Sequence, residues 1–272
     1  MNELRLEGVA FTYPDGTRAL DGIDLLVAAG SSLALVGANG SGKTTLAWHL
    51  NGLLRPTTGR VLIDGSETAG RRVAQLARVV GLAFQHPDRQ IFSTSVRDEV
   101  EFGPRHMGVD GSESFARVRA AVERVGLGED LGAHPGDLGE TRRKLLTLAS
   151  VLAMSTPVLV LDEPTTGLDA RGVERIESIV HELVADGRTV IAISHDMRFV
   201  AETFERVVVL DSGHIVLDGT PAEVFAEPAW ETLRATGLEP PAAAVAGARL
   251  GLGSTPTEAS LVEALQHTRP TP

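Results

Sequence analysis

Residues 37–45 combine the glycines, the lysine and the hydroxyl groups that can hold a polyphosphate. Glycines let successive backbone N–H groups turn toward an anion and wrap around it. Lys43 would place a compact positive charge against the outer phosphates, and the Thr44 hydroxyl can ligate Mg²⁺. A chance glycine-rich turn is the alternative, but an apolar run precedes the loop and a helical pattern follows it. The predicted phosphate-binding residues are Gly37, Ala38, Asn39, Gly40, Ser41, Gly42, Lys43, Thr44 and Thr45.

Two adjacent carboxylates, Asp162 and Glu163, come directly after the apolar run at 158–161. Such a pair at the end of a buried strand is costly unless a cation lies opposite. A Mg²⁺-nucleotide would supply that charge. Asp162 is therefore predicted to ligate Mg²⁺, and Glu163 to act as general base toward the attacking water. The alternative is a pair of solvated acids in a turn, and the phosphate loop upstream favours the catalytic interpretation.

Three further side chains are site candidates because of their places along the chain. Gln85 follows an expected strand and could contact both Mg²⁺ and the attacking water. His195 follows another strand and could hydrogen-bond the terminal phosphate and orient that water. Tyr13, the only tyrosine, could stack on adenine. Each has an ordinary alternative: a solvent-facing polar residue for Gln85, an unremarkable strand-end residue for His195, and a core position for Tyr13.

The elements that must position these residues follow from the apolar pattern. Short apolar runs such as 33–36 and 189–193 indicate strands buried on both faces. Strands that alternate with helices favour the α/β class with a mostly parallel sheet. Alternating polarity at 4–13 and 20–27 predicts antiparallel strands before the phosphate loop. Helices are predicted from 45 until Pro56 stops the first, then at 112–125, 140–154, 173–185 and 257–265, and further strands at 60–65, 79–85 and 158–161, with 207–210 and 214–217 as a hairpin.

Composition excludes several functional classes. The formal net charge is −11 over 272 residues, which gives no support to nucleic-acid binding. No cysteine is present, so disulfides and thiolate metal sites are excluded. No signal-peptide pattern is visible, and no apolar run approaches the roughly 18 residues that a spanning helix needs. If the protein works at a membrane, another chain is expected to hold it there.

A family resemblance rests on the order and spacing of all these motifs together. Tyr13, 37–45, Gln85, 161–164, 167–169 and His195 strongly resemble the ATP-binding subunits of ABC transporters. The resemblance covers about residues 3–228 and implies ATP, Mg²⁺ and ATP hydrolysis. It further implies a P-loop NTPase fold: a mostly parallel core sheet, an antiparallel N-terminal β-subdomain, and a helical subdomain at about 86–154 inserted in an ATPase domain at 1–228. The family's D-loop would be Gly167, Leu168 and Asp169.

A narrower resemblance, to the energy-coupling factor subfamily that imports cobalt and vitamins, rests on residues 84–92, 96–104 and 256–265. It implies a second ATPase subunit and a membrane scaffold that the segment after Gln85 contacts. A separate membrane component would bind the substrate. The chain would then lie at the cell membrane as a peripheral subunit on the cytoplasmic side, and the extension at 229–272 would help to pair the ATPase subunits. Arg89 departs from the subfamily pattern, which often has an acid there.

The family's LSGGQ signature is the motif that this chain matches least well. In the family this loop caps the terminal phosphate held by the partner subunit, and Glu140 beside that anion would be unfavourable. Thr141 could replace the lost serine hydroxyl, and Arg142 or Arg143 could offset the charge. Asp137 and Glu140 also fit a capping box, which is a purely structural interpretation. The five signature positions are Leu138, Gly139, Glu140, Thr141 and Arg142.

These departures leave three expectations for function. The first is an ATP-hydrolysing subunit that powers an importer, with a heterodimer favoured because a partner could carry an intact signature, although a homodimer is possible. The second is a regulatory ATP-binding subunit of a heterodimer, against which the intact Glu163 and His195 weigh. The third is a soluble ABC ATPase without a transport role. Such proteins usually have two ATPase domains or a coiled-coil insertion, and this chain has neither.

Overall fold

The computed structural model describes residues 2–268, so the last four residues of the extension at 229–272 lie outside the described residues. The strands are β1 Leu4–Thr12, β2 Arg18–Val27, β3 Ser32–Val36, β4 Thr58–Ile63, β5 Ser66–Glu67, β6 Val80–Ala83, β7 Val158–Asp162, β8 Thr189–Ile193, β9 Arg206–Asp211 and β10 His214–Gly219. The α-helices are α1 Lys43–Leu50, α2 Val73–Leu76, α3 Val96–His106, α4 Gly111–Val125, α5 Glu140–Ala153, α6 Ala170–Ala185, α7 Met197–Thr203, α8 Pro221–Val224, α9 Trp230–Ala235, α10 Ala242–Arg249 and α11 Glu258–Thr268.

The core sheet has the strand order β10-β9-β3-β8-β7-β6. Its strands are parallel except for β10, which pairs antiparallel with β9 as the predicted hairpin. The mostly parallel sheet is thus confirmed. Because β3, β7 and β8 run in the same direction, their carboxyl ends meet at one edge of the sheet. That edge carries the phosphate loop, Asp162 and His195.

The N-terminal strands form a separate antiparallel sheet with the order β2-β1-β4-β5. Its apolar side chains alternate as predicted and pack against α1 and one face of the core sheet. The structure therefore confirms the antiparallel β region. Helix α1 begins at Lys43, two residues earlier than predicted, and ends at Leu50 well before Pro56.

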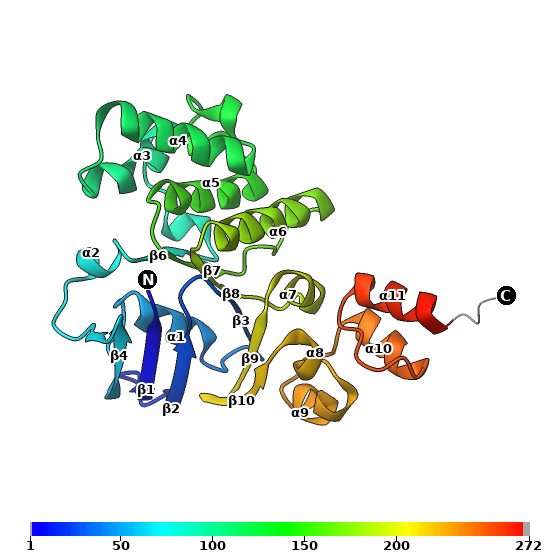
Figure 1. Ribbon diagram of the computed structural model, residues 1–272. Coiled ribbons are helices and arrows are strands. Elements are labelled where there is room, and N and C mark those ends of the chain that lie inside the picture. Colours follow the sequence, from blue (N-terminus) through cyan, green and yellow to red (C-terminus); the bar gives the residue numbers. More distant parts are fainter. Residues whose placement is uncertain (1, 269–272) are drawn as a thin grey trace.

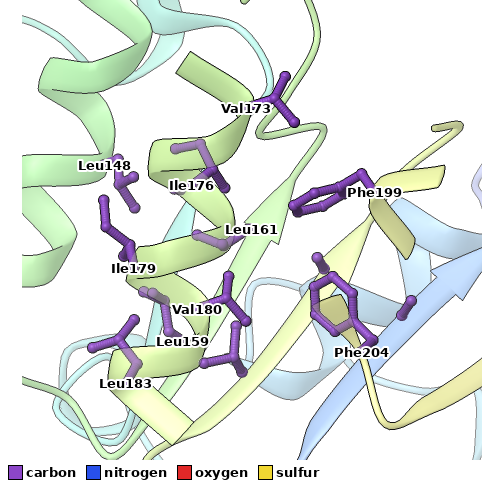
Figure 2. Packing of buried hydrophobic residues seen from close by; sticks show 14 of the residues in the cluster. Leu148, Leu159, Leu161, Val173, Ile176, Ile179, Val180, Leu183, Phe199 and Phe204 are labelled. Atoms are coloured by element: carbon purple, nitrogen blue, oxygen red, sulfur yellow. The ribbon is translucent and has the colours of Figure 1, made fainter. Parts of the chain in front are cut away.

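Helix α6 covers the other face of the core sheet through an apolar stripe (Figure 2). The stripe runs at three- and four-residue spacing, which places its members on one side of a helix. They pack with residues of strand β7 and with Leu148 of α5, and Phe199 and Phe204 belong to the same apolar cluster. Asp169 caps the helix by accepting a hydrogen bond from the Gly172 N–H at 2.8 Å. The stripe residues are Val173, Ile176, Ile179, Val180 and Leu183.

Helices α3, α4 and α5 lie together at one end of the molecule, and α8 to α11 lie at its side, away from them (Figure 1). Helices α4 and α5 match the predictions to within one residue. Helix α3 was not predicted. Its buried stripe includes Glu99 and Pro104, so it carries few of the apolar residues that reveal a helix in a sequence. The Glu99 carboxylate accepts hydrogen bonds from the Phe92 and Ser93 N–H groups at 3.1 and 2.9 Å.

The predicted capping box at the start of α5 is wrong. Asp137 belongs to a 3₁₀ turn, Pro135–Asp137, and the extended backbone of Leu138 separates that turn from the helix. Gly139 is the N-cap residue of α5, and it has no side chain that could accept a hydrogen bond from the first turn. Glu140 therefore opens the helix as its first residue and has no capping partner in Asp137.

Candidate functional site

The phosphate loop connects β3 to α1, and two of its glycines are required by close backbone contacts. Gly37 has a φ of +147°, and a Cβ there would lie 2.2 Å from the Leu210 carbonyl oxygen. Gly42 has a φ of +106°, and a Cβ there would lie 2.4 Å from the Ala19 carbonyl oxygen. Only glycine fits such positions. The loop is thus held against β9 and β2.

Lys43 lies at the centre of the loop and is almost fully buried. Its ammonium donates hydrogen bonds to the carbonyl oxygens of Gly37 and Ala38, at 2.7 and 2.8 Å. Burial lowers the pKa of Lys43, and the nearby carboxylates of Glu163 and Asp162 oppose that shift. Lys43 therefore stabilises the closed conformation of the loop and also lies next to Asp162 and Glu163.

Asp162 ends β7 with its carboxylate buried beside the loop. The nearby Thr44 hydroxyl favours the ionised form of this carboxylate. Burial, and then the charge of Glu163, raise the pKa of Asp162 to about 6, against the opposing charge of Lys43. Two buried carboxylates facing one lysine leave a net negative charge that a divalent cation would balance.

Glu163 follows β7 with a φ of +52°, which is uncommon for a residue other than glycine. Its Oε2 accepts a hydrogen bond from the Thr166 hydroxyl at 3.1 Å. Its Oε1 lies 3.3 Å from His195 Nε2, in a direction that does not make a hydrogen bond, and is without any other partner in residues 2–268. Burial raises the pKa of Glu163, and the hydrogen bond from Thr166 opposes that shift.

His195 stands over Glu163 with a partly exposed ring. Burial and the charge of Lys43 lower the pKa of His195, although Asp162 opposes them. The ring is therefore neutral at pH 7 and can donate or accept one hydrogen bond. This suits the predicted role beside the terminal phosphate.

A cleft of about 470 Å³ joins most of the predicted residues. Five residues that were not predicted as site residues also line it: Thr17, Arg18, Ala19, Thr166 and Ile193. Thr166 could have been predicted, because it lies only three residues after Glu163 in the sequence. From the predicted site, the residues that line the cleft are Tyr13, Asn39, Gly40, Gly42, Lys43, Thr44, Thr45, Gln85, Asp162, Glu163 and His195.

The cleft has donors that suit Mg²⁺. The Thr44 hydroxyl, the Asp162 carboxylate and the Gln85 amide are hard oxygen ligands, which Mg²⁺ prefers. Asp162 and Glu163 are both buried beside a single lysine, Lys43, so the site has an excess of negative charge. The residues present therefore fit the ion.

Tyr13 lines the same cleft as the acidic pair, and its predicted role is to hold the base and not the phosphates. Its hydroxyl is 3.0 Å from Thr45 Oγ1, and its ring packs edge-to-face against Phe11 with centroids 4.9 Å apart. These contacts fix the ring on the cleft wall.

Replacing Tyr13 with Ala is expected to weaken ATP binding by roughly 5- to 150-fold, because base–aromatic stacking contributes about 1–3 kcal/mol. Titration with ATP and with inorganic tripolyphosphate would measure it, and only ATP binding should weaken. Tyr13→Phe, which keeps the ring and loses the Thr45 contact, serves as the control. Equal losses for both ligands would mean that Tyr13 supports the phosphate loop and does not hold adenine.

The five signature positions lie apart from the cleft, and none of them lines it within residues 2–268. Leu138 is buried, whereas the next four are exposed. Thr141 donates a hydrogen bond to the Gly167 carbonyl oxygen at 3.2 Å, and Arg142 pairs with Asp130. The signature and the D-loop residues Gly167, Leu168 and Asp169 are thus neighbours in the same chain, and the role of the signature toward a partner's phosphate stays a prediction.

Comparison with known proteins adds independent findings. Residues 20–166 match the family described as ABC transporter. The energy-coupling factor transporter ATP-binding protein EcfA of Methanothermobacter thermautotrophicus is 41% identical over 224 residues, which cover 82% of this chain and 72% of that protein. EcfA2 of Symbiobacterium thermophilum is 43% identical over 244 residues, which cover 87% of this chain and 84% of that protein.

A solved structure has the same fold. The structure of cbiO1 from Clostridium perfringens, described as part of the ABC transporter complex cbiONQ, has a TM-score of 0.75 and 37% identity. The match covers 85% of this chain and 93% of that one. Across residues 2–268, no helix is both long and apolar enough to cross a bilayer.

Proposed function

This chain belongs to the ABC transporter family, and from that premise we propose that it hydrolyses ATP to drive the import of a vitamin or a transition-metal ion. It is an ATPase subunit of an energy-coupling factor type importer. The observation that carries the assignment of the site is the convergence of Lys43, Asp162 and Glu163 in one cleft. A strand edge that joins a phosphate loop to two carboxylates suits phosphoryl transfer.

We assign the roles as follows. Tyr13 holds adenine, and residues 37–45 with Lys43 bind the phosphates. Mg²⁺ at Thr44, Asp162 and Gln85 would supply the charge that offsets the developing negative charge on the phosphoryl oxygens. Glu163 accepts the proton of the attacking water, and neutral His195 donates a hydrogen bond to the terminal phosphate.

The larger organisation is also a proposal. Residues 1–228 form the ATPase unit, with 86–154 as its helical subdomain, and 229–272 form an extension that pairs ATPase subunits. The segment after Gln85 contacts a membrane scaffold, which holds the protein at the cytoplasmic side of the cell membrane. A separate membrane component supplies the substrate. The named relatives support this assembly because their names place them in energy-coupling factor transporters.

Co-purification tests the assembly. The chain, tagged and isolated from mild detergent, is expected to bring down a second ATPase and membrane proteins, with Mg²⁺-dependent ATP hydrolysis. Ribosomes or DNA in their place would overturn the transport role. An otherwise intact chain that binds ATP without any turnover at its own site would favour the regulatory alternative.

The altered signature favours a heterodimer in which this chain weakens its partner's site. Gly139→Ser, Glu140→Gly and Thr141→Gly together restore the serine and both glycines of the motif and remove the acid, while Arg142 stays in place of the glutamine. The same copy of this chain also carries Glu163→Gln, so that the turnover that remains comes from the partner's site. That turnover is expected to rise about tenfold, because hydrogen bonds from the signature loop to a charged phosphate contribute about 1.5–3 kcal/mol each.

Thr141→Ala is the matched control, since it breaks the same contact with Gly167 without restoring the motif. Its turnover should stay below that of the restored variant. Turnover that does not rise on restoration would mean that the present loop already supports the partner's site.

A further inference from the structure

The catalytic glutamate is connected to α5 of its own chain through the residue three positions after it. We propose that Thr166 is a positioning residue for Glu163 and that Lys144 on α5 holds Thr166 in place. This inference rests on the proposed role of Glu163 as general base. Two hydrogen bonds form the connection: one from the Thr166 hydroxyl to Glu163 Oε2 at 3.1 Å, and one from Lys144 Nζ to the Thr166 carbonyl oxygen.

The first bond fixes one oxygen of a carboxylate that has few other constraints. Within residues 2–268, Oε1 of Glu163 accepts no hydrogen bond, although it is buried and lies 3.3 Å from His195 Nε2. With Oε2 held by Thr166, the plane of the carboxylate is defined and Oε1 is left free to accept a proton. A base must lie within hydrogen-bond reach of the proton it removes, so a rotated carboxylate would work less well.

The second bond reaches the segment after Glu163 from the first two turns of α5. Lys144 binds the Thr166 carbonyl oxygen, and Thr141 binds the next carbonyl, that of Gly167, at 3.2 Å. Gly167 has a φ of +78°, so the chain turns sharply where α5 holds it. Two consecutive carbonyl groups are thus fixed by one helix.

The identity of Lys144 supports a specific role. The chain has two lysines, Lys43 and Lys144, and uses arginine for its other fixed cations. Lys43 holds the phosphate loop, and Lys144 lines a small cavity with Asp162 and Glu163. A lysine ammonium is a compact point charge that can bind a single carbonyl oxygen, whereas the arginine fork suits paired acceptors.

Helix α5 also contacts the segment that follows Gln85. The Gln90 side chain accepts a hydrogen bond from the Phe84 N–H and donates one to the Thr147 carbonyl oxygen of α5, both at 3.1 Å. Arg143 of α5 pairs with Asp88 at 3.2 Å. A shift of α5 would therefore act on the Gln85 segment and, through Lys144 and Thr166, on Glu163.

Valine and serine substitutions at Thr166 separate positioning from packing. Thr166→Val keeps the shape of the side chain and loses the hydroxyl. In the assembled complex, with ATP varied up to saturation, kcat is expected to fall about 3- to 10-fold with an unchanged KM, as expected for one lost hydrogen bond. Thr166→Ser keeps the hydroxyl and should stay within about twofold of the wild type. Thr58→Val, the same change at an exposed position of strand β4, controls for the substitution itself.

Three results would overturn the positioning role: Thr166→Val with wild-type kcat, equal losses in the valine and serine variants, or a KM that rises in step with the loss. Glu163→Gln, measured in parallel, distinguishes this failure from failure of the proposed function. If Glu163→Gln abolishes turnover while Thr166→Val does not reduce it, only the positioning inference fails. If Glu163→Gln stays active, the base assignment itself fails.

A double-mutant cycle tests the part played by Lys144. Lys144→Met removes the ammonium and should lower kcat about two- to fivefold. If Lys144 acts through Thr166, adding Lys144→Met to Thr166→Val should change kcat by less than about twofold. Losses that multiply would show that Lys144 acts independently of Thr166, which would overturn this step.

Discussion

Replacing Glu163 with Gln is expected to lower ATP turnover at this chain's site by about 10²- to 10⁴-fold, the usual contribution of a general base. The glutamine amide keeps the size of the side chain and can still accept the Thr166 hydrogen bond, but it cannot take a proton from water. The loss should appear in kcat. Phosphate release from the assembled complex, measured with the partner's site separately inactivated, would show it.

The matched control for this substitution is Glu174→Gln, which makes the same chemical change on the exposed face of α6. It should leave turnover near the wild-type value. ATP binding by the Glu163→Gln protein should also persist, because the phosphate loop and Tyr13 are untouched. Turnover within about tenfold of the wild type would be too high for a missing general base and would contradict the assignment.

Replacing Asp162 with Asn is expected to have opposite effects on activity and on stability. Mg²⁺-dependent turnover should fall by at least about 100-fold, since a charged metal ligand is lost. The nucleotide-free protein should become more stable at pH 7.5 by roughly 1–3 kcal/mol, because a buried carboxylate with a raised pKa destabilises the folded state. Urea unfolding without Mg²⁺ or nucleotide would measure the change.

The stabilisation expected for Asp162→Asn should increase with pH. The pKa of Asp162 is raised from 3.8 to about 6 on folding, so between these values the folded protein binds more protons than the unfolded chain. Stability is therefore lost as the pH rises through this window, and the full penalty is present above it. The gain from Asp162→Asn should be larger at pH 7.5 than at pH 5. A gain that is equal at both values, or as large in the exposed Asp110→Asn control, would contradict it.

Much of the site could be predicted from the sequence because its residues follow simple local patterns. The phosphate loop needs glycine at 37 and 42 for steric reasons, and those glycines are visible without a structure. Buried strands such as β7 and β8 appear as continuous apolar runs, so their carboxyl ends locate Asp162 and His195. Parallel pairing then brings these residues to one edge.

The parts that could not be predicted depend on contacts between distant segments. The first turns of α5 show this most clearly: Asp137 and Glu140 have the spacing of a capping box, but a 3₁₀ turn removes Asp137 from the helix. The bond from Lys144 to Thr166 joins residues far apart in the sequence, and no local pattern marks it. Helix α3 was not predicted because a glutamate and a proline occupy part of its buried face, where apolar residues would have indicated a helix.

The position of β3 in the core sheet has a consequence for synthesis of the protein. β3 carries the phosphate loop, yet Leu35 pairs with Ile193 on one side and with Val208 on the other. A nascent chain therefore contains the complete phosphate-loop sequence long before either neighbouring strand has left the ribosome. Pairing over such sequence separations is slow, and the apolar β3 stays open to wrong partners meanwhile. The ATP site is complete only when Asp162 and His195 are also in place, so the nucleotide cannot stabilise the chain at this early stage.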